Sequence, residues 1–137
     1  MARKKKANLP KPTEAELELL RVLWDRGPST VREVHEELGG ATGYTTTLKI
    51  FQLMADKGLV TRDESQRSHI YTAVGRAETT QRQLVSDLLQ RAFGGSPTKL
   101  VVQALSETRA TPEDLAEIRR VLDELETTQK KKGRSKK

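Results

Sequence analysis

Hydroxyl and amine groups gather at the start of one predicted helix, within the run GYTTTLKIFQLMADKGLV of residues 43–60. Threonine is a mediocre helix former, so three threonines in one first turn suggest a role other than helix formation. One interpretation is that Thr45 simply caps the helix. The other is that Thr45, Thr46 and Lys49 contact a nucleic acid, because hydroxyls and amines donate to phosphates and a threonine methyl can touch a thymine methyl.

Helical periodicity assigns the side chains of this run to two faces. The face predicted to enter the core carries Thr47, Ile50, Phe51 and Met54. The opposite face carries Thr45, Lys49 and Gln52, and Thr46 lies on its flank. We therefore expect the polar side chains to face outward, where a partner can reach them.

Two further helices are predicted before this run. The first covers residues 13–26, where Thr13 and Glu16 have the spacing of a capping box. The second covers residues 29–38, with Ser29 as its expected N-cap. Because the connection between them is short, these helices are expected to pack as neighbours.

A β-hairpin is predicted after the run, with strands over 59–64 and 68–74 on either side of a polar link. Three helices followed by a hairpin are the order of a winged helix-turn-helix, whose recognition helix brings its N-terminal residues to base edges. Arg67 stands in the polar link, where an arginine can contact DNA or simply be solvated. The predicted DNA-binding residues are Tyr44, Thr45, Thr46, Lys49, Gln52 and Arg67.

The rest of the folded chain, residues 76–126, has only helical patterns. Ser96 and Thr111, each followed by proline, are expected to begin two of its helices. The predicted fold class is therefore mostly α with a small β-hairpin. It combines a winged helix-turn-helix domain over residues 13–75 with a helical region over residues 76–126.

The formal net charge of +6 comes from the two ends of the chain. Residues 1–12 and 127–137 hold five and six basic residues and no acid, so the body between them is net negative. Both ends are predicted to be disordered arms. Such arms suit a polyanionic partner, and a purely solubilising role explains them equally well.

The sequence offers no residue set for catalysis or metal binding. It has no cysteine and two histidines, His35 and His69, without metal-site spacing. His35 stands among Glu33, Glu36 and Glu37, but a solvated helix face explains this pattern better than a metal site. We therefore expect no enzyme, no cofactor and no metal.

Membrane and secretory segments are not predicted either. No apolar run approaches the roughly 20 residues of a transmembrane helix, and the basic N-terminal stretch has no apolar segment behind it. We expect a cytoplasmic protein without a membrane partner.

The run GYTTTLKIFQLMADKGLV, followed by RDESQRSHIYTAV, resembles the recognition helix and wing of the penicillinase repressor family (BlaI, MecI and CopY). The front segment LPKPTEAELELLRVLWDRGPSTVREVHEEL is similar to the same family, with its acidic helix and a tryptophan before the turn. The resemblance covers residues 9–126.

This resemblance implies a homodimer that binds a palindromic operator and represses transcription. It also implies a sensor or protease partner that relieves repression. The apolar faces of the C-terminal helices would join the subunits, although an intramolecular core is the alternative. The expected dimer contacts are Leu84, Leu88, Leu100, Val101, Leu105, Leu115, Ile118 and Leu122.

The chain departs from the family pattern at three places. Copper-responsive members carry a cysteine-rich site, whereas this chain has no cysteine. Members that respond to β-lactams are cleaved at an Asn-Phe bond, whereas the matching bond here is Gln103–Ala104. Many relatives have arginine where this chain has Leu53.

A rival function is a non-enzymatic protein- or RNA-interaction module that uses the winged helix and the basic arms.

Overall fold

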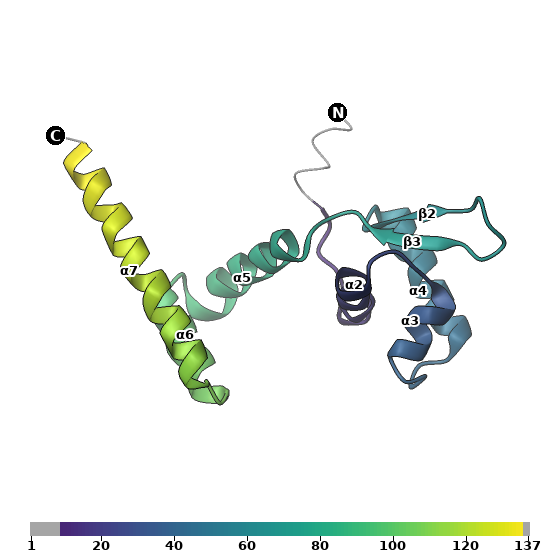
Figure 1. Cartoon of the computed structure of the whole chain (residues 1–137), viewed down its shortest axis with the longest axis horizontal. Coiled ribbons are helices and arrows are strands. Elements are labelled where there is room, and N and C mark those ends of the chain that lie inside the picture. Colours follow the sequence, from purple (N-terminus) through teal and green to yellow (C-terminus); the bar gives the residue numbers. More distant parts are fainter. Residues whose placement is uncertain (1–8, 136–137) are drawn as a thin grey trace. The chain divides into compact units, whose positions relative to one another are not determined.

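The computed structural model describes residues 9–135, with side chains described for residues 9–132. It contains α2 (Glu14–Arg26), β1 (Ser29–Thr30), α3 (Val31–Glu37), α4 (Tyr44–Lys57), β2 (Val60–Asp63), β3 (Ile70–Ala73), α5 (Ala77–Phe93), α6 (Pro97–Glu107) and α7 (Pro112–Ser135), as Figure 1 shows. The expected class, mostly α with a winged helix-turn-helix and C-terminal helices, is confirmed.

The chain divides into two compact units inside α5, after Leu88. The sequence placed the boundary before α5, at residue 76. The first half of α5 contacts the winged unit, because Thr80 is buried there and Gln83 donates a hydrogen bond to the carbonyl of Leu9 at 2.9 Å.

Local side-chain bonds set the starts of the first two helices. Thr13 and Glu16 form the predicted capping box at α2. At α3 the prediction of Ser29 as the N-cap is wrong, because Thr30 takes that position in a capping box with Glu33. Ser29 is instead a buried strand residue whose hydroxyl donates to the carbonyl of Gly27.

A three-stranded antiparallel sheet, in the order β1-β3-β2, forms the wing and its root. The predicted hairpin corresponds to β2 and β3, which pair from Val60 with Ala73 to Asp63 with Ile70. The sequence missed β1, whose two residues pair with Tyr71 and Ile70. This pairing fixes the start of α3 against the base of the wing.

The core of the winged unit lies between α2, α3, α4 and the sheet. Phe51 and Tyr71 pack at its centre, with 4.6 Å between their ring centroids. Gly58 ends α4 in the left-handed conformation. The chain then turns into β2, and the core is completed by Leu19, Leu20, Val22, Leu23, Val31, Val34, Met54, Leu59 and Val60.

The segment before α2 packs against the winged unit. Pro12 is buried, and the ammonium of Lys11 pairs with the carboxylate of Asp87 at 2.5 Å. Residues 9–12 therefore hold defined positions, whereas the sequence predicted a disordered arm up to residue 12. Residues 1–8 of that arm lie outside the described residues.

The second unit consists of the end of α5, α6 and α7. Ser96 caps α6 with Pro97 at its first position, and Thr111 exchanges hydrogen bonds with Asp114 at the start of α7. Both starts are as predicted. The helix α7 continues to Ser135, so it includes residues that we expected to form a disordered tail from residue 127 on. Among the side chains described in this unit, residues 89–132, none is buried.

Candidate nucleic-acid interface

The outward face of α4 is polar and exposed. Its inward face buries Thr47, Phe51 and Met54 and half-buries Ile50, which confirms the predicted division of the helix. Thr45, Thr46, Lys49 and Gln52 are all exposed on the other side. The buried set anchors the helix in the core, so the polar set is held in place without being covered.

The start of α4 has no side-chain cap. The helix begins at Tyr44, and its N-cap is Gly43, so the interpretation of Thr45 as the cap is wrong. Thr47 has a separate structural role, because its buried hydroxyl donates to the carbonyl of Gly43 at 3.2 Å. Thr45 and Thr46 are left exposed beside the backbone N–H groups of the first turn, which attract anions.

The wing reaches out beyond the sheet in Figure 1. Its turn is ordered locally, because Asp63 accepts a hydrogen bond from the N–H of Ser65 at 2.9 Å. That bond is the main reason that the pKa of Asp63 lies below its ordinary value. Arg67, in the turn, is fully available to a partner because it is exposed.

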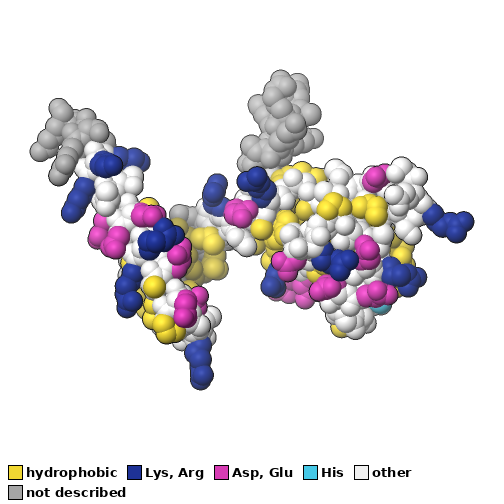
Figure 2. Space-filling model, in the orientation of Figure 1, with side chains coloured by type: hydrophobic (Ala, Val, Ile, Leu, Met, Phe, Trp, Pro, Cys, Tyr) yellow, Lys and Arg dark blue, Asp and Glu magenta, His cyan; other side chains and the backbone are white. Residues whose placement is uncertain are grey.

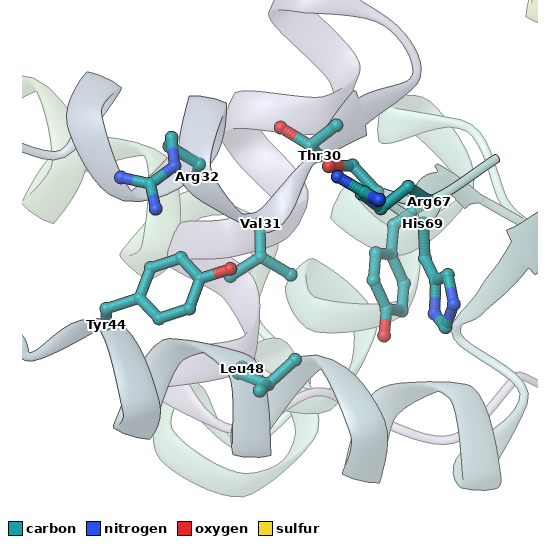
Figure 3. Close-up of a pocket in the computed structure, with 9 residues that line it drawn as sticks. Thr30, Val31, Arg32, Tyr44, Leu48, Arg67 and His69 are labelled. Carbon is teal, nitrogen blue, oxygen red and sulfur yellow. The ribbon is translucent and has the colours of Figure 1, made fainter. Parts of the chain in front are cut away.

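A pocket of about 300 Å³ joins the wing to the start of α4. Tyr44 and Arg67, both predicted site residues, line it together, but Thr45, Thr46, Lys49 and Gln52 do not. Figure 3 shows Arg32 and Tyr44 on one side of the pocket and Arg67 and His69 on the other. Its lining residues are Thr30, Val31, Arg32, Tyr44, Leu48, Arg67, Ser68, His69 and Tyr71.

Arg32 is a pocket residue that the sequence did not single out. Its guanidinium carbon lies 5.3 Å from the centre of the Tyr44 ring, within the range of a cation–π contact. That ring also makes a T-shaped contact with His35, with 5.7 Å between the ring centroids. The only sequence signal was its position in the first turn of a predicted helix, three residues after Ser29, the wrongly predicted N-cap.

The basic side chains of the winged unit fall into two groups. Lys11, Arg26, Lys57 and Arg62 pair with carboxylates at 2.5 to 3.9 Å. Arg32, Lys49 and Arg67 form no ion pair with any part of the chain that the structure describes. Figure 2 shows basic and acidic side chains interleaved over the visible face of this unit. Arg21, Arg76 and Arg82 of the same unit are likewise without an ion pair to the described residues, so all six can receive an external anion, and Arg32, Lys49 and Arg67 are the ones at α3, α4 and the wing.

The predicted dimer residues all lie at least partly open to solvent. Leu84, Leu100, Leu115 and Ile118 are half-buried within the chain. Leu88, Val101, Leu105 and Leu122 are exposed by 37% to 54%. Figure 2 shows hydrophobic side chains at the surface of these helices.

Within residues 9–132, no group of histidine, aspartate and glutamate side chains is placed to hold a metal ion. No helix among the residues that the structure describes is long and apolar enough to cross a membrane.

The chain is similar in sequence to known proteins. The family model described as Penicillinase repressor matches residues 12–124. The transcriptional regulator BlaI of Mycobacterium tuberculosis is 35% identical over 124 residues, which cover 88% of each chain. Among solved structures, the monomeric form of Bacillus licheniformis BlaI in complex with the blaP half-operator matches 53% of this chain and 90% of its own, at 23% identity and a TM-score of 0.45. The Thermotoga maritima transcriptional regulator Tm0710 matches 88% of this chain and 77% of its own, at 17% identity and a TM-score of 0.45.

Proposed function

The chain belongs to the penicillinase repressor family of DNA-binding transcriptional regulators, and from this premise we propose that it represses transcription as a homodimer on a palindromic operator. Residues of α4 would read the bases, and the wing would contact the flanking backbone. The C-terminal helices would join the two subunits.

One observation carries this proposal: the outward face of α4 is exposed and polar, while its inward face is locked in the core. A winged helix places its recognition helix in the major groove, with N-terminal residues at base edges. The small hydroxyls of Thr45 and Thr46 allow close approach at that end. Gln52 can donate to and accept from an adenine, and Lys49 can reach a guanine or a phosphate.

The wing and the first turn of α4 would bind the backbone. Arg67 is exposed and free of ion pairs with residues 9–132, so its charge can neutralise a phosphate. The first turn of α4 has no side-chain cap, so its N–H groups can bind a second phosphate. Phosphate contacts of this kind set the register of the protein on the duplex and leave sequence choice to α4.

The case for a dimer rests on the second unit. The end of α5, α6 and α7 bury none of the side chains described over residues 89–132, so this unit has no adequate core of its own. A second copy of the same helices would cover Leu88, Val101, Leu105 and Leu122, and a two-fold pair of subunits would match a palindrome.

A sensor or protease that relieves repression is part of the proposal. The bond between Gln103 and Ala104 lies in α6, where exposure of every residue from 101 to 107 favours local opening.

Selection of bound sequences from random duplex DNA tests the proposal directly. We expect enrichment of a palindrome whose half-sites lie one helical turn, or a multiple of one, apart. An enriched sequence without two-fold symmetry would contradict the dimer on a palindrome. Failure to enrich any sequence would favour the rival function, an interaction module for proteins or RNA.

A further inference from the structure

We propose that the pocket formed by Arg32, Tyr44, Arg67, Ser68 and His69 receives one phosphodiester group of the DNA backbone, with Arg32 as a main donor. We call these five residues the phosphate pocket. The inference deepens the proposed function and rests on it, because the phosphate belongs to the DNA that α4 would read.

The lining of the phosphate pocket suits an anion. Two guanidinium groups, an imidazole and the hydroxyls of Ser68 and Tyr44 surround it, and no carboxylate lines it. The nearest acidic residue in sequence, Glu33, is engaged elsewhere. Its carboxylate accepts from the N–H of Thr30 at 2.9 Å and lies 3.9 Å from Arg26. The volume of about 300 Å³ equals roughly ten water molecules, which is ample for a phosphate group.

Arg32 is held in place before any ligand arrives. Its guanidinium lies over the ring of Tyr44, and that ring is in turn in T-shaped contact with His35. Figure 3 shows that Arg67 enters from the opposite side of the pocket. Arginine binds phosphate through two parallel N–H donors, so a guanidinium held over a ring is well prepared for this contact.

The position of the phosphate pocket explains what the contact would do. Tyr44 is the first residue of α4, and Thr45 and Thr46 follow it directly. A phosphate bound between Tyr44, Arg32 and Arg67 would fix the start of α4 against the DNA backbone. Arg32 would thereby set the depth at which the two threonines meet the base edges.

The test compares the wild type with Arg32→Ala and Arg32→Lys across a salt series on random-sequence duplex DNA. Arg21→Ala is the matched control, because Arg21 is an exposed arginine of the same unit that lines a different, partly acidic pocket. Loss of one phosphate contact should lower the salt exponent by about 0.9 in Arg32→Ala. Arg32→Lys and Arg21→Ala should retain the wild-type exponent. Equal changes in Arg32→Ala and Arg21→Ala would overturn the proposal, because they would indicate a general effect of charge.

A second experiment locates the phosphate. Single phosphates of the selected duplex are replaced in turn by uncharged methylphosphonates. Wild-type affinity should fall several-fold at one position in each half-site, and Arg32→Ala should be insensitive to replacement at that position. If the two proteins respond alike at every position, Arg32 contacts no phosphate and the proposal fails while the proposed function stands. If the wild type binds no duplex in a salt-dependent way, both fail together.

Inorganic phosphate distinguishes a backbone site from a site for a free anion. At constant ionic strength, millimolar phosphate should leave DNA affinity unchanged, because a single pocket without the rest of the duplex holds the anion weakly. Displacement of DNA by millimolar phosphate in the wild type, but not in Arg32→Ala, would assign the pocket to the free anion and overturn the backbone assignment.

Discussion

The ammonium of Lys57, in the last turn of α4, donates to the buried carboxylate of Glu16, in the first turn of α2, at 2.7 Å. The same carboxylate accepts from the N–H of Thr13 in the capping box. One buried acid therefore ties the recognition helix to the helix on which it packs. This bond sets the position of the C-terminal end of α4, far from its reading end.

The first prediction concerns this ion pair. Lys57→Met should lower the free energy of unfolding by about 1–3 kcal/mol, because it leaves the Glu16 carboxylate buried without its charged donor. Lys49→Met is the control, since Lys49 is an exposed lysine on the same helix without an ion pair to residues 9–132. Denaturant unfolding without DNA measures the difference. Equal stabilities of the two variants would contradict a structural role for the pair.

The same pair predicts a dependence of stability on pH. Burial acts to raise the pKa of Glu16, but hydrogen bonds from Lys57 and Thr13 and the charge of Lys57 outweigh it, so the pKa lies below the ordinary 4.5. A lowered folded-state pKa stabilises the protein above the unfolded value, and this stability is lost as the pH falls through the folded value. Stability should therefore decline from about pH 4.5 downward. The decline should be shallower in Glu16→Gln.

The second prediction concerns the reading face. Thr46→Ala or Lys49→Ala should weaken binding to the selected operator by roughly 1–3 kcal/mol if base edges are contacted. Folding should hardly change, because both side chains are exposed. Thr79→Ala, an exposed threonine on α5, should bind like the wild type. An equal loss on random DNA would make these residues backbone contacts instead.

The third prediction concerns the subunit interface. Leu88→Asp or Leu122→Asp should produce monomers and abolish tight operator binding, because burial of an unpaired carboxylate in an apolar interface is costly. Thr98→Asp, at the exposed start of α6, should leave the association unchanged. Sedimentation measures the oligomeric state. An unaltered dimer would remove these leucines from the interface.

The fourth prediction concerns the basic ends, which hold eleven of the 25 lysines and arginines. If they lie along DNA, deletion of residues 1–8 and 128–137 should make DNA affinity less dependent on salt concentration. It should also lower the affinity for random DNA more than the affinity for the operator. Preference for the operator should survive, because lysines on the backbone read charge and not sequence.

Because the deletion also shortens α7, glutamine at positions 130, 131 and 132 should serve as a second variant that keeps the helix. We expect the glutamine variant to reduce the salt dependence of DNA affinity in part. An unchanged exponent in both variants would leave the winged unit as the whole binding surface.

Local patterns in the sequence were sufficient for most of the fold. Capping boxes and prolines act within one helical turn, so Thr13, Ser96 and Thr111 could be assigned correctly. The faces of α4 followed from helical period alone. These features depend on neighbours along the chain, which the sequence displays directly.

Contacts between distant residues explain what the sequence did not predict. Ser29 and Thr30 are both good caps, and only the pairing of Ser29 with Tyr71 draws it into the sheet and leaves Thr30 as the cap. In the same way, Arg32 meets Tyr44 because the chain brings the start of α4 beside the start of α3. No local pattern marks either contact, so the pocket between α3 and the wing could not be foreseen.

Because the N-terminus of α4 has no side-chain cap, substitutions there that raise stability would be expected to weaken repression. A Cβ atom added at position 43 would meet no atom within 4 Å, and the backbone there is extended, so serine or aspartate could be introduced without backbone strain. Either would cap α4 and raise stability by a few tenths of a kcal/mol. The same cap would occupy N–H groups that a phosphate could use, and aspartate would add repulsion. A screen for thermal tolerance would therefore favour residues at position 43 that a screen for tight repression would reject, the pattern of a stability–activity trade-off.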